Sequence, residues 1–321
     1  MNHLLISNFL NRNRTFQLIL LLPLLGGVVY FLHTNSIAFD LALSPFIALL
    51  FPAIQTIPMF LTIMTIIVLC LTLILWQLLF RKSDIFNTVS YYPSVFYLLF
   101  LLSSGICRKS LFSIIFLFIV LLLLFINSNY TQDNVKGKVF ISGILIGVLS
   151  FFNLSAILLL FFLIGSLITH RFSLKKDMVL AFFGFILPVI YFLSYYFLTD
   201  QFGKVIEAYS HLSFFGFAKS LTTLSVFQLV RFILLFVILS YLFIRLRLLY
   251  VSKLIMSRRY LISIDAMSIV LLFMLFFSNI SFEEWQLYVV LPFTAYFSLI
   301  IREKRHWIPH SILIIMTFFL L

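Results

Sequence analysis

Basic residues in this 321-residue chain gather in short clusters between long apolar segments, and most of the clusters fall in every second gap. Six alternate gaps contain 17 of the 22 lysines and arginines, whereas the gaps between them contain four of these residues and five of the ten acids. Such an excess on alternate loops is typical of a protein that crosses a bilayer repeatedly, with its basic loops in the cytoplasm. The pattern predicts a multi-pass membrane protein with a cytoplasmic N-terminus. The six clusters are Arg12 and Arg14; Arg81 and Lys82; Lys136 and Lys138; Arg171, Lys175 and Lys176; Arg245, Arg247, Lys253, Arg258 and Arg259; and Arg302, Lys304 and Arg305.

The composition excludes most classes of soluble protein. Hydrophobic residues make up 63% of the chain and charged residues only 10%, so a soluble fold would lack the polar residues to cover its surface. The net charge of +12 needs no nucleic-acid partner, because basic loops of a membrane protein face anionic lipid headgroups. The two cysteines and six histidines show neither a disulfide framework nor a metal-ligand spacing. The lipid bilayer is therefore the partner that the composition predicts.

Eleven apolar segments follow one another along the chain, and several of them are shorter than the ~20 residues that cross about 30 Å of hydrocarbon. We therefore expect between nine and eleven full crossings. The fold class that follows is all-α, a polytopic transmembrane helical bundle that forms one integral-membrane domain over residues 1–321, with no soluble domain. The expected segments are residues 16–33, 56–80, 90–106, 110–127, 138–152, 154–170, 178–199, 224–244, 261–278, 285–301 and 307–321.

Three regions outside these segments are expected to have structure of their own. Residues 1–15 mix apolar and polar positions, as a helix lying at the membrane interface does. Residues 34–55 are too apolar for a loop in water and are interrupted by prolines, which predicts short juxtamembrane helices on the outer leaflet. Residues 200–223 form the second long outer loop. Four of its polar residues have a 4-3-4 spacing that predicts one shared helical face: Asp200, Lys204, Glu207 and His211.

Charged residues inside apolar segments are candidates for function, because a charge in hydrocarbon costs several kcal/mol without a partner. Arg231 lies in the outer half of the eighth segment. Its guanidinium is suited to binding an anion such as a lipid phosphate, and equally to reaching the headgroups or pairing with a nearby glutamate. Asp265 lies close to the inner end of the ninth segment, where we expect it to pair with Arg258 or Arg259.

Other charged residues lie at the outer edge of the predicted segments. Asp40 stands alone in an apolar loop, where an acid serves as a general base, a metal ligand or a helix N-cap. Arg108 and Lys109 are the one basic pair on the outer side, and either bind an anion or stabilise the topology. Glu283 and Glu284 either bind a divalent cation together with Asp40 or mark the end of a segment. A divalent cation is thus the one cofactor that these residues suggest.

The middle of the chain has a particular order of segments. A short span containing Gly143 and Gly147 turns at the outer face and returns, and it is followed by basic residues and by a span that ends near Pro188. This order resembles the membrane module of the GT-C glycosyltransferases. The stretches that carry the resemblance are residues 91–127, 136–172 and 178–197. The chain as a whole also resembles short, Phe-rich inner-membrane proteins of Bacteroidota, which implies location in a bacterial inner membrane.

The GT-C resemblance implies a multi-span enzyme that takes a sugar from a polyprenyl-phosphate donor at the outer leaflet. It also implies a catalytic acid in the first outer loop, where Asp40 is the sole acid. Asp40 would deprotonate the acceptor hydroxyl or hold a divalent cation, and Arg231, Arg108 and Lys109 would contact the donor phosphate. The chain departs from the family where Arg108 and Lys109 replace a commonly acidic residue, and in the expected lack of a C-terminal soluble domain.

Two other functions stay open on the sequence alone. One is a non-catalytic subunit that scaffolds a cell-envelope assembly through its aromatic, lipid-facing surface, and the other is a transporter. The feature that distinguishes an enzyme from a scaffold is convergence. An enzyme requires Asp40, Arg231 and the acids of residues 200–211 around one outward cavity, whereas a scaffold leaves them dispersed.

Overall fold

Every regular element in the described part of the chain is a helix, and no strand occurs there. The structure is a computed structural model, and it describes residues 58–82, 92–103, 111–128, 135–152, 154–170, 174–203, 205–206, 255–277 and 291–296, together with Gly26, Ser298 and isolated positions between 230 and 247. The helices in chain order are α4 (Pro58–Lys82), α5 (Tyr92–Ser103), α6 (Leu111–Ser128), α7 (Val135–Phe152), the 3₁₀ helix η5 (Leu154–Leu158), α8 (Leu159–His170), α9 (Leu174–Leu198) and α13 (Ile255–Phe277).

These helices coincide with seven of the segments predicted from the apolar runs. The bounds agree to within six residues, and the largest difference is at the start of α13, which begins at Ile255 where residue 261 was expected. The helices α7 and α9 also begin earlier than their apolar runs, at Val135 and Leu174. Their first turns contain lysines, whose long unbranched side chains are good helix formers. The basic residues therefore belong to the helix ends as well as to the loops.

A single residue separates α7 from the next helical segment, as the bounds of the two apolar runs predicted. The helix α7 ends at Phe152 and the chain re-enters helical structure at Leu154. The first five residues of this return, Leu154–Leu158, form a 3₁₀ helix. A 3₁₀ helix rises about 2.0 Å per residue and an α-helix about 1.5 Å, so η5 and α8 together span about 28 Å. The tighter winding thus brings a short segment close to the thickness of a hydrocarbon core.

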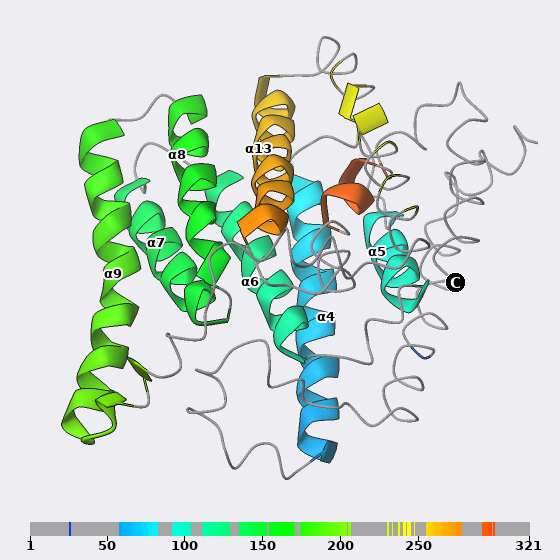
Figure 1. Cartoon of the computed structure of the whole chain (residues 1–321). Helices are drawn as coiled ribbons and strands as arrows, with labels where there is room; N and C mark the ends of the chain where they lie inside the picture. Colours follow the sequence, from blue (N-terminus) through cyan, green and yellow to red (C-terminus); the bar gives the residue numbers. More distant parts are fainter. Residues whose placement is uncertain are drawn as a thin grey trace, which may run out of the picture.

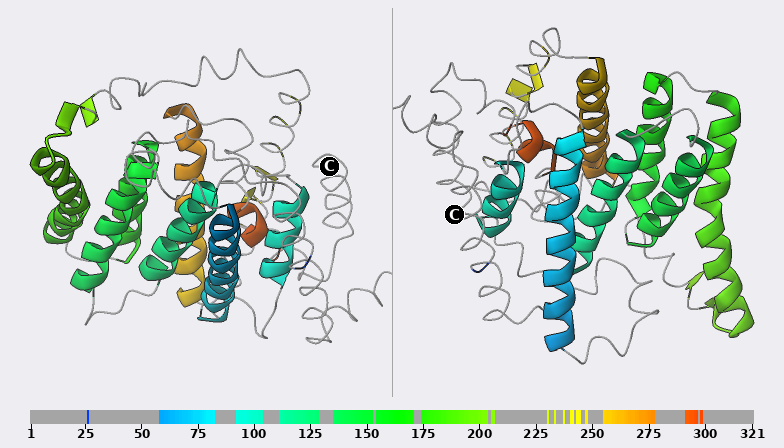
Figure 2. Two further views of the ribbon diagram at one scale, coloured as in Figure 1. Left: turned by 90° about the horizontal axis from the view of Figure 1, so that it is seen from below. Right: turned by 180° about the vertical axis from the view of Figure 1, so that it is seen from behind.

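The helices form a row in which each packs on its neighbours (Figure 1). The helix α9 lies at one edge and packs on α7, α7 on α6, and α6 on α4, with α5 beside α4. The helix α13 crosses this row and packs on α8, η5 and α6, an arrangement that both further views also show (Figure 2). One core joins α4, α6, α8, α13 and the segment 291–296, and its members include the fully buried Trp76, Phe116, Phe162, Leu271 and Tyr296.

Glycines hold α7 and α9 in close contact. A Cβ atom added to Gly143 would overlap the carbonyl oxygen of Ala181, and one added to Gly184 would overlap that of Phe140. A Cβ atom on Gly147 would lie 2.5 Å from the carbonyl oxygen of Phe185. Small residues four positions apart allow helix backbones to approach in this way, particularly in membranes. Gly143 faces Ala181, and four residues later Gly147 faces Phe185, so α7 and α9 run in the same direction.

Pro188 lies inside α9, and the helix continues for ten more residues to Leu198. The GT-C resemblance implied a span that ends near this proline, but the helix continues beyond it. A proline inside a helix removes one backbone hydrogen bond and crowds the carbonyl four residues earlier, which belongs here to Gly184. The ring of Pro188 packs towards Gly147, where its Cγ would lie 3.1 Å from an added Cβ. The turn of α9 that lacks this hydrogen bond, between Gly184 and Pro188, thus packs against α7.

Two of the described helices are long and apolar enough to cross a membrane. They are Ile63–Phe80 within α4 and Lys175–Leu198 within α9, while Ile115–Ile126 and Ser155–Thr169 are shorter apolar helices. A core helix of a soluble protein has a similar composition but is mostly buried, whereas only 17% of Lys175–Leu198 is buried. Large apolar side chains such as Phe183 and Tyr191 project from α9 with 61% and 71% of their surface exposed. These two helices indicate association with a membrane.

Buried hydroxyl groups in the bundle bond mainly to their own helices. Thr72 donates to the carbonyl oxygen of Leu69 over 2.7 Å, and Ser150 donates to that of Gly147 over 2.7 Å. Ser166 and Thr294 make the same kind of bond to the carbonyl three residues earlier. This arrangement satisfies polar groups without water or a second helix, as a helix in an apolar environment requires.

Candidate functional site

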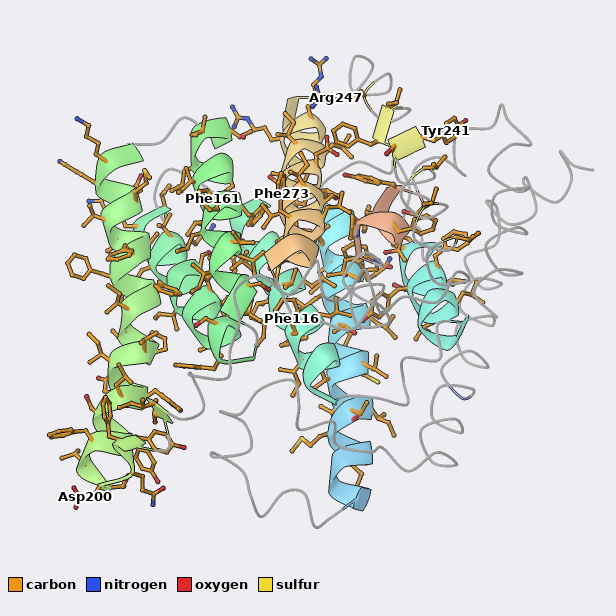
Figure 3. The ribbon with its side chains drawn as sticks, viewed as in Figure 1. Phe116, Phe161, Asp200, Tyr241, Arg247 and Phe273 are labelled. Carbon is orange, nitrogen blue, oxygen red and sulfur yellow. The ribbon has the colours of Figure 1, made fainter. Side chains whose placement is uncertain are left out.

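The helix ends that carry basic residues lie together at one end of the described bundle (Figure 1). The helix α4 runs towards this end and finishes at Lys82, while α7, α9 and α13 begin there with Lys136, Lys175 and Arg258 near their first turns. Arg247 projects from the same end (Figure 3). These positions come from four of the six sequence clusters. Basic residues of four clusters therefore lie towards the same end of the described helices.

The opposite end of α9 is closed by Asp200, which was one of the candidate site residues. Asp200 has a φ of 54° and lies just beyond the last helical residue, Leu198. Its backbone N–H donates to the carbonyl oxygen of Phe197 over 3.2 Å, and the N–H of Gln201 donates to that of Tyr196 over 3.0 Å. This pair of bonds is the Schellman motif, whose left-handed residue is usually glycine. Aspartate enters this conformation more readily than most residues, so Asp200 serves as the helix terminator.

The prediction of one helical face for four outer-loop residues is wrong for Asp200. The chain leaves the helix at Asp200, so the 4-3-4 spacing does not begin on a continuous helix. The side chain is exposed and lies at the end of the bundle opposite to Arg247 (Figure 3). The physical reason for the error is the left-handed backbone at Asp200, which hydropathy and residue spacing do not reveal.

A small aromatic cluster supports this end of α9. The rings of Phe151 and Phe192 lie 4.8 Å apart, and those of Phe192 and Tyr196 lie 4.7 Å apart. Val205, which follows the turn at Asp200, is 2% exposed and belongs to the same cluster. Tilted aromatic pairs at these separations contribute about 0.5–1.5 kcal/mol beyond the area they bury. The end of α7, the end of α9 and the returning chain thus form one unit.

The remaining candidate residues lie outside the described residues, as do residues 1–15 and 34–55, most of the outer loop 200–223 and the predicted segment 307–321. Their convergence around an outward cavity therefore stays a prediction. A divalent cation also stays a prediction, although the described residues contain no group of three or more possible metal ligands. The candidates concerned are Asp40, Arg108, Lys109, Lys204, Glu207, His211, Arg231, Glu283 and Glu284.

Within the described part of the chain, two acids are buried, Asp177 and Asp265. Asp177 lies in the first turn of α9, where the helix dipole stabilises a negative charge. Asp265 lies ten residues into α13, about 15 Å from its start, and is 5% exposed. Asp265 lies one turn into the apolar run that begins at residue 261, as expected, and α13 begins six residues before that run.

Asp265 takes part in a hydrogen-bonded network between α13 and the segment 291–296. The hydroxyl oxygen of Tyr296 lies 2.7 Å from Oδ1 of Asp265 and 2.8 Å from Oγ of Ser268. Oγ of Ser268 also lies 2.7 Å from the carbonyl oxygen of Ile264. Asp265 and Ser268 are three residues apart and so lie on one face of α13. We call this set the Asp265–Tyr296–Ser268 network.

The hydrogen bond between Asp265 and Tyr296 was not predicted from the sequence. The predicted pairing of Asp265 with Arg258 or Arg259 stays a prediction. The missed signal is the polar tyrosine in an apolar run, together with the three-residue spacing of Asp265 and Ser268. A hydroxyl that is 0% exposed needs a partner, and a buried acid on another helix supplies one.

Comparison of the chain with protein-family models, with curated proteins and with solved structures finds no match.

Proposed function

We propose that the chain is a multi-pass protein of the bacterial inner membrane with its N-terminus in the cytoplasm. The observation that carries the proposal is the common position of the basic ends of α4, α7, α9 and α13, opposite to Asp200 (Figures 1 and 3). Helices that cross a bilayer in alternate directions keep their basic ends on the cytoplasmic side. The exposed apolar face of α9 supports the same conclusion, since lipid tails would cover it.

The function proposed for this protein is the handling of a polyprenyl-phosphate-linked sugar at the outer leaflet, as in GT-C glycosyltransferases. In this topology the end marked by Asp200 faces the outer leaflet, and the loop that contains Asp40 is on the same side. Asp40 deprotonates the acceptor hydroxyl or holds a divalent cation. Arg231, Arg108 and Lys109 contact the donor phosphate through charge-assisted hydrogen bonds of about 1.5–3 kcal/mol each.

The experiment compares the turnover of lipid-linked sugars in cells that produce the protein and its variants, with lipid extracts analysed by mass spectrometry. Asp40→Asn and Arg231→Gln should each abolish the turnover while protein level and membrane insertion are unchanged. Arg231→Lys should restore only part of it, because an ammonium group lacks the bidentate geometry of a guanidinium. The matched control is Asp200→Asn, an outer-side acid with a backbone role, which should leave turnover unchanged.

A second candidate is a non-catalytic subunit that scaffolds an envelope assembly. The observation that favours it is the exposure of large aromatic side chains along α9, which include Phe182, Phe183, Tyr191 and Phe197. If Asp40→Asn and Arg231→Gln both retain the turnover of the wild-type protein, the enzymatic function is refuted and the scaffold takes its place.

A further inference from the structure

Two lysines stand at the start of the exposed apolar face of α9. Lys175 and Lys176 are the second and third residues of the helix, and both side chains are exposed. Val179 follows Lys175 by four residues, and Phe183 follows Lys176 by seven, so the four side chains lie on one helical face. Val179 and Phe183 are 56% and 61% exposed. This face of α9 therefore has a charged end and an apolar part, and both are exposed.

The neighbouring helix α7 contributes a third exposed lysine at the same level. Lys136 is exposed and lies seven residues before Gly143, which contacts the backbone of Ala181 on α9. Lys175 lies six residues before Ala181. At about 1.5 Å per residue, both lysines are about 9–11 Å from this contact, and in the same direction because the two helices run in parallel. The contact through glycine thus brings the basic ends of two helices side by side.

Two further charged residues belong to these helix ends. Asp177 lies in the first turn of α9 and is 3% exposed, so its carboxylate is inside the bundle. Lys138 of α7 is half-buried, and both residues have interactions within the protein. Asp177 follows Lys176 directly, and adjacent residues of a helix do not share a face. The charge that these two helix ends present at their surface is therefore positive.

We propose that the basic ends of α7 and α9 form a binding site for an anionic phospholipid. The side chains of Lys136, Lys175 and Lys176 contact the headgroup, and the acyl chains lie against Val179 and Phe183. An anionic amphiphile matches both parts of this surface, whereas a soluble anion would leave the apolar part in water. A zwitterionic phospholipid covers the apolar part but neutralises its own phosphate. The site rests on the proposed insertion of α9 in a membrane and not on the proposed sugar chemistry.

The test is quenching of tryptophan fluorescence by phospholipids with brominated acyl chains, with the full-length protein in vesicles of phosphatidylglycerol and phosphatidylcholine. Phe183→Trp places a reporter about 10 Å from Lys176 along α9, at the depth of the acyl chains. The protein without this substitution gives the signal of the native tryptophans, which is subtracted. Brominated phosphatidylglycerol should associate with the reporter site at least about fivefold more tightly than brominated phosphatidylcholine, since one lysine near the membrane surface favours an anionic lipid by about this factor.

Variants in the reporter protein assign the preference to individual lysines. Lys175→Gln combined with Lys176→Gln should lower it at least about fivefold, whereas Lys175→Arg combined with Lys176→Arg should retain it because the charges remain. Lys136→Gln alone should lower it by about two- to fivefold if α7 belongs to the site. The matched control is Arg258→Gln combined with Arg259→Gln. It removes two exposed charges from α13, which packs on α8, η5 and α6, and should leave the preference at α9 unchanged.

Equal quenching by the two brominated lipids refutes the anionic site but leaves α9 in the membrane. A preference that survives the loss of both lysines of α9 also refutes the site, as does an equal loss in the arginine control, which would show a response to total charge. An unchanged preference in Lys136→Gln excludes α7 from the site. A reporter that neither lipid quenches would instead refute the insertion of α9 in the membrane.

Discussion

The close contact between α7 and α9 predicts an opposite response to the same substitution at two glycines of one helix. Gly143→Ala places a Cβ atom against the carbonyl oxygen of Ala181, a backbone atom that cannot rotate away. Gly137→Ala, two turns earlier in α7, places its Cβ atom where nothing lies within 4 Å. The first substitution must separate two helices, whereas the second needs no movement at all.

The expected magnitude follows from the difference between the two variants. Both gain about 0.5–1 kcal/mol of stability from replacing glycine by alanine in a helix. Only Gly143→Ala carries the cost of overpacking, about 1–3 kcal/mol. The free energy of unfolding of Gly143→Ala should therefore lie about 1–3 kcal/mol below that of Gly137→Ala.

The measurement is reversible unfolding of the purified protein in mixed micelles with increasing fraction of a denaturing detergent. A double variant sharpens it, because the Cα atom of Gly143 lies 3.3 Å from a Cβ atom added to Gly184. Once the helices have separated, the second alanine should cost less, so the two effects should sum to more than the effect of the double variant. Equal stability of Gly143→Ala and Gly137→Ala would refute the close approach of α7 and α9.

Three further predictions concern other parts of the bundle. Asp200→Gly should preserve or raise stability in detergent and Asp200→Val should lower it by about 1–2 kcal/mol, since a β-branched residue resists positive φ; the reverse order would exclude the left-handed turn. Phe183→Lys should reduce membrane insertion of α9 by about 2.5–3.5 kcal/mol in a translocon assay if lipid covers this face, whereas a change within about 0.5 kcal/mol would indicate water there. Tyr296→Phe should lower the free energy of unfolding by about 1–3 kcal/mol because it removes the buried hydrogen bonds to Asp265 and Ser268, while Tyr191→Phe at an exposed position should not.

The sequence predicted the positions of the described helices because burial in lipid or in the core requires continuous apolar runs. It placed the starts of α7, α9 and α13 too late, since hydropathy measures burial and not helical conformation. Lysines and arginines in a first turn remain helical while their charged groups reach water. The same reasoning missed η5, because a 3₁₀ turn and an α turn contain the same apolar residues.

The candidate site was harder to predict, for reasons that Asp200 and Tyr296 illustrate. The spacing from Asp200 suggested a helix, but the conformation at Asp200 depends on how the end of α9 packs on Phe151 and Val205. Tyr296 contacts Asp265 across a sequence separation of 31 residues. Contacts between distant segments depend on the packing of the whole bundle, so local sequence patterns do not predict them.

The most direct test of the central claim is labelling of single cysteines from outside intact spheroplasts, in a protein whose Cys70 and Cys107 are replaced by alanine. Ser83→Cys and Ser173→Cys lie beside the basic ends of α4 and α9, and Asn153→Cys lies at the turn after α7. A membrane-impermeant maleimide should label Asn153→Cys in intact spheroplasts and should label the other two only after permeabilisation. Labelling of Ser83→Cys and Ser173→Cys in intact spheroplasts would contradict the topology and, with it, the proposed site at the outer leaflet.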